Sequence, residues 1–190
     1  MIDFELMWKS FCGNLHECGK INVETWIGGI KAQFMYSTYI FYYDVPVKRH
    51  RDQKKGGYVM KLKMVGLGKM GLNLALNMKE HGVDVEGFDV NEEARQKAQS
   101  ENIKTYASLE DVASKDEKNV IWVMLPAGKI TNSVLLQLVE LCKGNDIVID
   151  GGNSDHRDSL KTAHLMEEKG IYFFDIGTSG GVYGARHGAS

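Results

Sequence analysis

The stretch that decides the fold is "KLKMVGLGKMG" (residues 61–71), a short apolar-leaning run that leads into three glycines. Gly66, Gly68 and Gly71 form the pattern G-x-G-x-x-G, and Asp89 lies at the end of the next predicted strand. A glycine triplet alone occurs often by chance. A triplet between a strand and a helix, followed by an acid after the second strand, is typical of a dinucleotide-binding turn.

Each glycine of this turn has a distinct expected role. Gly66 permits the tight turn, Gly68 lets the backbone approach a pyrophosphate, and Gly71 lets the helix pack closely on the strand. Backbone N–H groups and the dipole at the helix start favour an anionic diphosphate. The pattern therefore predicts a dinucleotide cofactor, and the alternative is a glycine-rich turn without a ligand.

Apolar runs and helical patterns alternate throughout residues 60–190. The predicted strands cover residues 61–66, 83–90, 120–125, 146–150 and 171–177, and the predicted helices cover residues 69–82, 92–102, 129–144 and 155–170. Short links between alternating strands and helices predict an α/β fold. We expect a doubly wound parallel sheet (Rossmann) whose ligands bind at the carboxyl ends of the strands.

The charges around Asp89 bear on the choice between NAD and NADP. The Asp89 carboxylate is placed to accept hydrogen bonds from the ribose hydroxyls of the adenosine. A 2′-phosphate would meet the carboxylates of Asp89, Glu92 and Glu93, and the first cation after Asp89 in the sequence is Arg95. This balance predicts NAD, with NADP disfavoured. The alternative is that Asp89 only caps a helix and has no part in cofactor choice.

Three further loops follow predicted strands, namely "MLPAG" (124–128), "DGGNS" (150–154) and "GTSGGVYGAR" (177–186). The Asn153 side chain offers both a donor and an acceptor, which suits a substrate hydroxyl or the nicotinamide carboxamide. In the last loop, the Ser179 hydroxyl and the backbone N–H groups of Ser179, Gly180 and Gly181 can bind an anion. Taken singly, each loop is also compatible with an ordinary tight turn.

The composition limits the other classes of function. The 190 residues are 43% hydrophobic and 25% charged, which fits one globular domain or one domain with an appendage. The net charge of -2 gives no basic field for nucleic acid, and no apolar run is long enough to span a membrane. Three scattered cysteines argue against a disulfide framework and favour the cytoplasm. No cysteine and histidine spacing matches a metal site.

Residues 1–59 differ in character from the rest of the chain. They contain 11 of the 18 aromatic residues, including the strand-like run "FMYSTYIFYY" (34–43). We predict a boundary at Met60, with residues 1–59 poorly ordered or a mistranslated upstream region, and residues 60–190 a dinucleotide-binding domain. Codons for residues 55–57 that spell a ribosome-binding tract would support the upstream region. A true N-terminal extension is the alternative.

Four motifs in register resemble one known family. "VGLGKMGLNLALNM", "VIWVMLPAG", "IDGGNS" and "DIGTSGGVYGARHGA" are similar to decarboxylating 6-phosphogluconate dehydrogenase, above all to its shorter bacterial form, within the β-hydroxyacid dehydrogenases. The likeness runs from Met60 to the last residue. Relatives that act on 3-hydroxyisobutyrate share the glycine turn but differ at the segment "DGGNS", which makes them the alternative family.

The resemblance implies a reaction and a cofactor. Members of this family oxidise 6-phosphogluconate, which loses CO2 to give ribulose 5-phosphate while NAD or NADP is reduced, in the cytoplasmic pentose phosphate pathway. NADP-preferring members carry an Asn-Arg-Thr-like stretch where this chain has Asp89, Val90 and Asn91. The difference agrees with the charge argument for NAD.

The resemblance also implies site residues. The cofactor-binding set is Gly66, Leu67, Gly68, Lys69, Met70, Gly71, Asp89, Val90, Asn91, Leu125, Pro126, Ala127 and Asn153. The substrate-binding set is Asn153, Ser179, Gly180 and Gly181. The family's catalytic lysine and glutamate come from an all-helical domain after the last motif seen here, so we assign no catalytic residue and expect this chain alone to be inactive.

Two points about assembly and role stay open in the sequence. Family members form homo-oligomers through the helical domain, and this is not assured for the present chain. A non-catalytic NAD-binding module and a gene remnant are the alternatives to a working dehydrogenase part.

Overall fold

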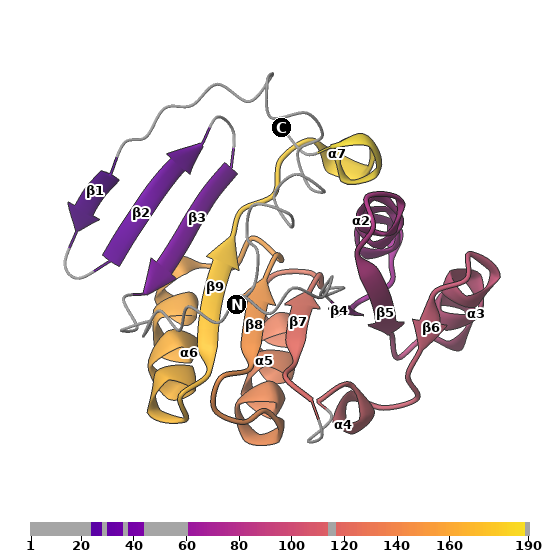
Figure 1. The fold of residues 1–190 in the computed structure, drawn as a ribbon. Coiled ribbons are helices and arrows are strands. Elements are labelled where there is room, and N and C mark those ends of the chain that lie inside the picture. Colours follow the sequence, from indigo (N-terminus) through magenta and orange to yellow (C-terminus); the bar gives the residue numbers. More distant parts are fainter. Residues whose placement is uncertain (1–23, 28–29, 36–37, 44–60, 114–116, 189–190) are drawn as a thin grey trace, which may run out of the picture.

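The computed structural model of this chain describes residues 61–113 and 117–188 in full and the backbone of residues 24–27, 30–35 and 38–43 (Figure 1). The predicted boundary at Met60, the rest of residues 1–59 and the origin of that segment lie outside the described residues. Those expectations stay predictions.

One sheet organises the molecule, and its strands order as β1-β2-β3-β9-β8-β7-β4-β5-β6 (Figure 1). Strands β4 to β9 pair parallel with one another. Strands β1, β2 and β3 pair antiparallel, and β3 joins the sheet by pairing antiparallel with β9. The strands are β1 (Glu24–Ile27), β2 (Ile30–Met35), β3 (Thr38–Tyr43), β4 (Lys61–Val65), β5 (Asp84–Phe88), β6 (Lys104–Thr105), β7 (Val120–Val123), β8 (Ile147–Asp150) and β9 (Tyr172–Ile176).

Helices cover both faces of the parallel strands. The helices are α2 (Lys69–Glu80), α3 (Glu92–Ser100), α4 (Leu109–Val112), α5 (Lys129–Leu141), α6 (His156–Glu168) and α7 (Gly181–His187). One buried apolar cluster joins the sheet to α2, α3 and α7, and a second joins its other face to α4, α5 and α6. The doubly wound α/β fold that the sequence predicts is confirmed.

Alternate residues of β7 pack into the two apolar clusters on opposite faces of the sheet. Trp122 of β7 packs into the cluster beside α2, whereas Ile121 and Val123 pack into the cluster beside α5. Every residue of β7 is buried, which explains why its sequence is a continuous apolar run. The short elements β6, α4 and α7 were not predicted, because two to seven residues carry too little periodicity.

The order of the strands determines where a ligand can bind. Strand β4 lies between β5 and β7, so the connections leave it in opposite directions along the sheet. This is the switch point at which doubly wound sheets open a crevice beyond the carboxyl ends of their strands. The glycine turn follows β4 at that point.

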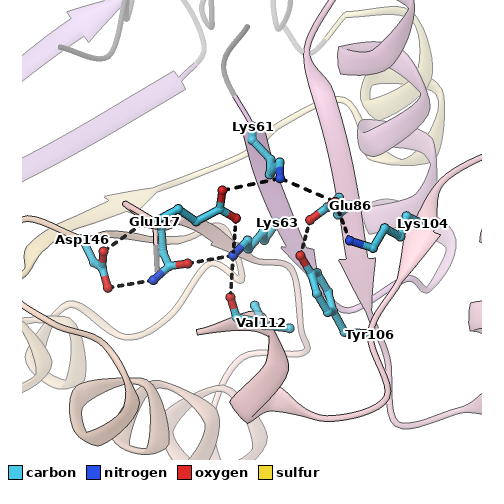
Figure 2. A network of polar contacts seen from close by, with 9 residues as sticks. Lys61, Lys63, Glu86, Lys104, Tyr106, Val112, Glu117 and Asp146 are labelled. Carbon is cyan, nitrogen blue, oxygen red and sulfur yellow. Dashed lines mark hydrogen bonds and ion pairs between the residues drawn. The ribbon is translucent and has the colours of Figure 1, made fainter. Parts of the chain in front are cut away.

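A buried lysine lies at the opposite, amino edge of the sheet (Figure 2). Lys63 is only 1% exposed, and its Nζ donates to Val112 O at 2.9 Å and to Asn119 Oδ1 at 2.7 Å. Glu117 Oε1 lies 3.2 Å from the same nitrogen. Three acceptors meet the three donors of the ammonium, which is the condition for burying such a charge.

A second polar group joins β5 to β6 beside that lysine. The buried Glu86 carboxylate accepts hydrogen bonds from Tyr106 Oη and from Lys104 Nζ, the latter at 3.1 Å. Burial alone would raise the pKa of Glu86, but these two hydrogen bonds and the charges of Lys61 and Lys104 together lower it. Burial and the same carboxylate raise the pKa of Tyr106. The amino edge is thus held by satisfied polar contacts rather than open to a ligand.

We expect Lys63→Met to lower the free energy of unfolding by about 1–3 kcal/mol, because it leaves the Val112 carbonyl and the Asn119 side-chain oxygen without this donor. Lys61→Met on the same strand is the control. Its ammonium is partly exposed, so the loss should be less than about 1 kcal/mol. Urea unfolding of both variants measures the difference, and equal effects would contradict the reading of Lys63.

Candidate functional site

The glycine turn after β4 has no room for side chains at two positions. Gly66 adopts φ +96°, and a Cβ there would lie 2.4 Å from Met124 O. A Cβ on Gly71 would lie 1.9 Å from Gly66 O. The first contact fixes the turn against the loop after β7, and the second presses α2 onto the turn.

Gly68 is different, because the space beside it is open. It precedes the first residue of α2, is exposed, and has φ -64°, a value that any residue adopts. No described atom lies within 4 Å of the position that a Cβ would take. An exposed helix N-terminus that begins with this open position fits a diphosphate.

The Asp89 carboxylate connects the ends of β4 and β5. Its Oδ2 accepts the Leu67 N–H at 2.7 Å, and its Oδ1 accepts the Asn91 N–H at 2.8 Å. The cap of α3 is made instead by Asn91, whose side chain accepts the Glu93 N–H at 2.8 Å. Asp89 therefore stands half-buried beside the glycine turn, where the sequence predicts the ribose contact.

A cation reaches this turn that the sequence order alone does not bring near it. Arg95 Nη1 donates to Asp89 O at 2.7 Å and to Val90 O at 3.2 Å. The start of α3 brings the Arg95 guanidinium close to the end of β5. The positive charge near Asp89 is therefore closer than the order of residues along the sequence indicates. The Val90 side chain, 86% exposed, lies beside it on the surface.

The loops after β7 and β8 lie against each other. Pro126 O accepts a hydrogen bond from Thr131 Oγ1 at 2.8 Å, which ties the segment of Leu125, Pro126 and Ala127 to the start of α5. A Cβ on Gly152 would lie 2.7 Å from Leu125 O. The structure thus brings together two of the predicted cofactor-binding segments.

Asn153 joins the loops after β8 and β9. It adopts φ +57°, and its Oδ1 accepts the Thr178 N–H at 3.2 Å. Ser179, Gly180 and Gly181 follow directly and are exposed. The predicted substrate-binding residues therefore form one neighbourhood, and their role in binding stays a prediction.

Helix α7 anchors the second of these loops on α2. Both Glu80 carboxylate oxygens pair with the Arg186 guanidinium, at 2.6 and 2.5 Å. Figure 1 shows α7 beside α2, on the same face of the sheet. This ion pair could not be predicted from the sequence, because its partners are 106 residues apart in the chain.

Two buried carboxyl groups lie in β8 and β9, just before the loops of Asn153 and Ser179. Asp150 and Asp175 are paired in register at the ends of β8 and β9. Burial raises the pKa of both, and that of Asp175 reaches about 6, with the Asp150 charge adding to the rise. Asp150 Oδ1 accepts the Gly152 N–H at 2.9 Å. Asp150 Oδ2 makes no hydrogen bond of normal geometry within the described part of the chain, although the Ser154 hydroxyl lies close.

Metal sites and membrane-spanning helices are both absent from the described residues. Within residues 61–113 and 117–188, no three His, Cys, Asp or Glu side chains gather as a metal ion would require. The helices there are too short or too polar to cross a membrane.

The geometry of the turn and the comparisons with known proteins agree. The family model described as the NAD binding domain of 6-phosphogluconate dehydrogenase matches residues 61–190. The chain belongs to the 6-phosphogluconate dehydrogenase family. The resemblance seen in the four motifs is thereby confirmed, and residues 61–190 are an NAD-binding domain of an oxidoreductase family.

Individual relatives of the 6-phosphogluconate dehydrogenase family match over the same region. The "6-phosphogluconate dehydrogenase, NAD(+)-dependent, decarboxylating" of Bacillus subtilis is 37% identical over 132 residues, which are 67% of this chain and 28% of that protein. The chain spans 28% to 44% of the length of the first curated relatives that it matches.

Two solved structures resemble the fold equally well. Plasmodium falciparum 6-phosphogluconate dehydrogenase, solved in its apo form, with NADP+ and with 6-phosphogluconate, has a TM-score of 0.61 at 28% identity. The match covers 68% of this chain and 29% of the Plasmodium falciparum chain. Mycobacterium tuberculosis 3-hydroxyisobutyrate dehydrogenase with L-serine also has a TM-score of 0.61 at 28% identity, over 68% and 44% of the two chains.

The raised pKa of Asp175 predicts a dependence of stability on pH. The folded pKa of about 6 exceeds the usual value of about 4, so the folded state alone holds the extra proton between these values. Stability therefore falls as the pH rises through this window and stays lower above it. We expect Asp175→Asn to be about 1–2 kcal/mol more stabilising at pH 8 than at pH 4.

Thermal unfolding of wild type and variant across this pH range measures the effect. The control is Asp84→Asn, which removes an exposed aspartate at the start of β5, and the difference between pH 4 and pH 8 should be larger for Asp175→Asn than for this control. Parallel profiles for wild type and Asp175→Asn would contradict a buried acid that titrates near pH 6.

Proposed function

We propose that residues 61–188 bind NAD in preference to NADP, as the coenzyme-binding part of a decarboxylating 6-phosphogluconate dehydrogenase. The observation that carries the proposal is the Asp89 carboxylate, which is hydrogen-bonded to the glycine turn at Leu67. A carboxylate there accepts hydrogen bonds from ribose hydroxyls and repels a 2′-phosphate. The Bacillus subtilis relative, whose name states NAD(+) dependence, supports the same choice.

The described residues fit the parts of a dinucleotide in order along the sheet edge. The diphosphate would lie before the α2 amides at Gly68, and the adenosine ribose would lie beside Asp89. The exposed Val90 would contact the adenine. The segment 125–127 and Asn153 would border the nicotinamide end, where NAD supplies the acceptor for a hydride.

The substrate end of the proposal rests on the loops after β8 and β9. Asn153 and the segment 179–181 offer an amide, a hydroxyl and backbone N–H groups, which suit the hydroxyls and an anionic group of a sugar acid. In this proposal 6-phosphogluconate is oxidised and decarboxylated to ribulose 5-phosphate and CO2. The described histidines His156 and His164 are exposed on α6, so they are not assigned a part in the chemistry.

A second candidate substrate follows from one observation. The 3-hydroxyisobutyrate dehydrogenase matches this fold with the same TM-score as the 6-phosphogluconate dehydrogenase. Calorimetric titration of the NAD-loaded chain with 6-phosphogluconate and with 3-hydroxyisobutyrate separates the two. If only 3-hydroxyisobutyrate gives binding heat, it becomes the proposed substrate in place of 6-phosphogluconate.

The open space at Gly68 gives a direct test of coenzyme binding. We expect Gly68→Ala to raise the Kd for NAD at least tenfold, about 1.4 kcal/mol, because its methyl group occupies the place of the diphosphate. The fold should lose less than about 1 kcal/mol, since the backbone suits alanine and no neighbour is displaced. Calorimetry and thermal unfolding measure the two effects.

Gly71→Ala is the contrasting variant for the same experiment. Its methyl group would clash with Gly66 O, so we expect lost stability before lost affinity. Wild-type protein that gives no heat with millimolar NAD would overturn the proposed function. A Gly68→Ala variant that binds NAD normally would overturn the assigned place of the diphosphate.

A further inference from the structure

Arg95 is the fourth residue of α3, just after the acidic Glu92 and Glu93 of the first turn. Its backbone N–H donates to Asn91 O inside the helix at 3.2 Å. Its guanidinium instead makes hydrogen bonds outside the helix, to the turn that follows β5.

The guanidinium fixes the backbone that carries Asp89. Nη1 donates to the carbonyl oxygens of two successive residues, Asp89 at 2.7 Å and Val90 at 3.2 Å. Hydrogen bonds from a charged donor are stronger than neutral ones. The two carbonyls that follow β5 are thus held from the side of α3.

The Asp89 side chain is held separately, by two backbone N–H groups. Its two carboxylate oxygens accept the Leu67 and Asn91 N–H groups at 2.7 and 2.8 Å. Each carboxylate oxygen still has capacity for another hydrogen bond. With backbone and side chain both fixed, the carboxylate faces a ligand without having to be ordered first, which is a gain in affinity.

We infer that Arg95 is a positioning residue for the coenzyme: it clamps the turn after β5 so that Asp89 presents its carboxylate to the ribose hydroxyls. The inference rests on the proposed NAD binding and adds a residue outside the glycine turn and its acid. Arg95 acts through Asp89 and does not itself touch the ribose.

The other role open to this guanidinium is direct contact with a 2′-phosphate. The two roles differ in what each dinucleotide loses when Arg95 is removed. A clamp acts on the ribose hydroxyls and so weakens NAD. A phosphate contact acts on the 2′-phosphate and so weakens NADP more than NAD.

The experiment compares Arg95→Ala, Arg95→Lys and the control Arg157→Ala in the full chain. Arg157 also lies in the first turn of a helix, but its guanidinium pairs with the exposed Asp155. Calorimetry gives the Kd for NAD, for NADP and for the NAD analogue that lacks the 2′-hydroxyl of the adenosine ribose.

We expect Arg95→Ala to weaken NAD binding about fivefold to tenfold and to weaken binding of the 2′-deoxy analogue less than twofold. Arg95→Lys should recover part of the loss, because an ammonium can donate to the same carbonyls. Arg157→Ala should bind all three ligands as the wild type does. The double variant Asp89→Ala with Arg95→Ala should be no weaker than Asp89→Ala alone.

Each contrary result has a distinct meaning. Equal losses for NAD and the 2′-deoxy analogue, or a larger loss for NADP than for NAD, would overturn the clamp while leaving NAD binding in place. An Arg95→Ala variant that binds NAD as tightly as Arg157→Ala does would also overturn it. Wild-type protein that binds no dinucleotide would overturn both the clamp and the proposed function. If Arg95→Ala does not fold, Arg95→Lys and Arg95→Gln carry the same comparison.

Discussion

Helix α2 can meet the end of β4 only because Gly71 has no side chain, since a methyl group there would overlap Gly66 O. That close approach sets the direction of α2 and opens the space at Gly68. It also brings the Leu67 amide within 2.7 Å of Asp89 Oδ2, which joins β4 to β5. The site at the carboxyl edge therefore depends on a steric constraint, and its hydrogen bonds follow from it.

The sequence was sufficient for the parts of the fold that carry strong periodicity. The run before Gly66, the helix after it and the buried β7 all follow from local pattern, and so does the place of Asp89. The contact of Arg95 with the turn after β5 could not be predicted, because it is made to backbone carbonyls, which every residue type carries. The Asp150 and Asp175 pair escaped because it exists only once the register of β8 and β9 is known.

Buried ionisable groups are satisfied differently at the amino ends and at the carboxyl ends of the strands. At the amino edge, Lys63 and Glu86 have hydrogen-bonding partners, and Figure 2 shows them as one connected group. At the carboxyl edge, Asp150 and Asp175 lie side by side without a cation among the groups that shift their pKa values. Hydrogen bonds between partners stabilise the amino ends of the strands. At the carboxyl ends, the two buried carboxyl groups can accept further hydrogen bonds, which the stability of the core alone would not require.

The pairing of Glu80 with Arg186 has a mechanical consequence. Helix α2 starts at the glycine turn and, over 12 residues or roughly 18 Å, reaches the Glu80 carboxylate that pairs with Arg186 of α7. The loop of Ser179 ends where α7 begins. One helix and one ion pair therefore join the glycine turn to α7, which follows the loop of Ser179.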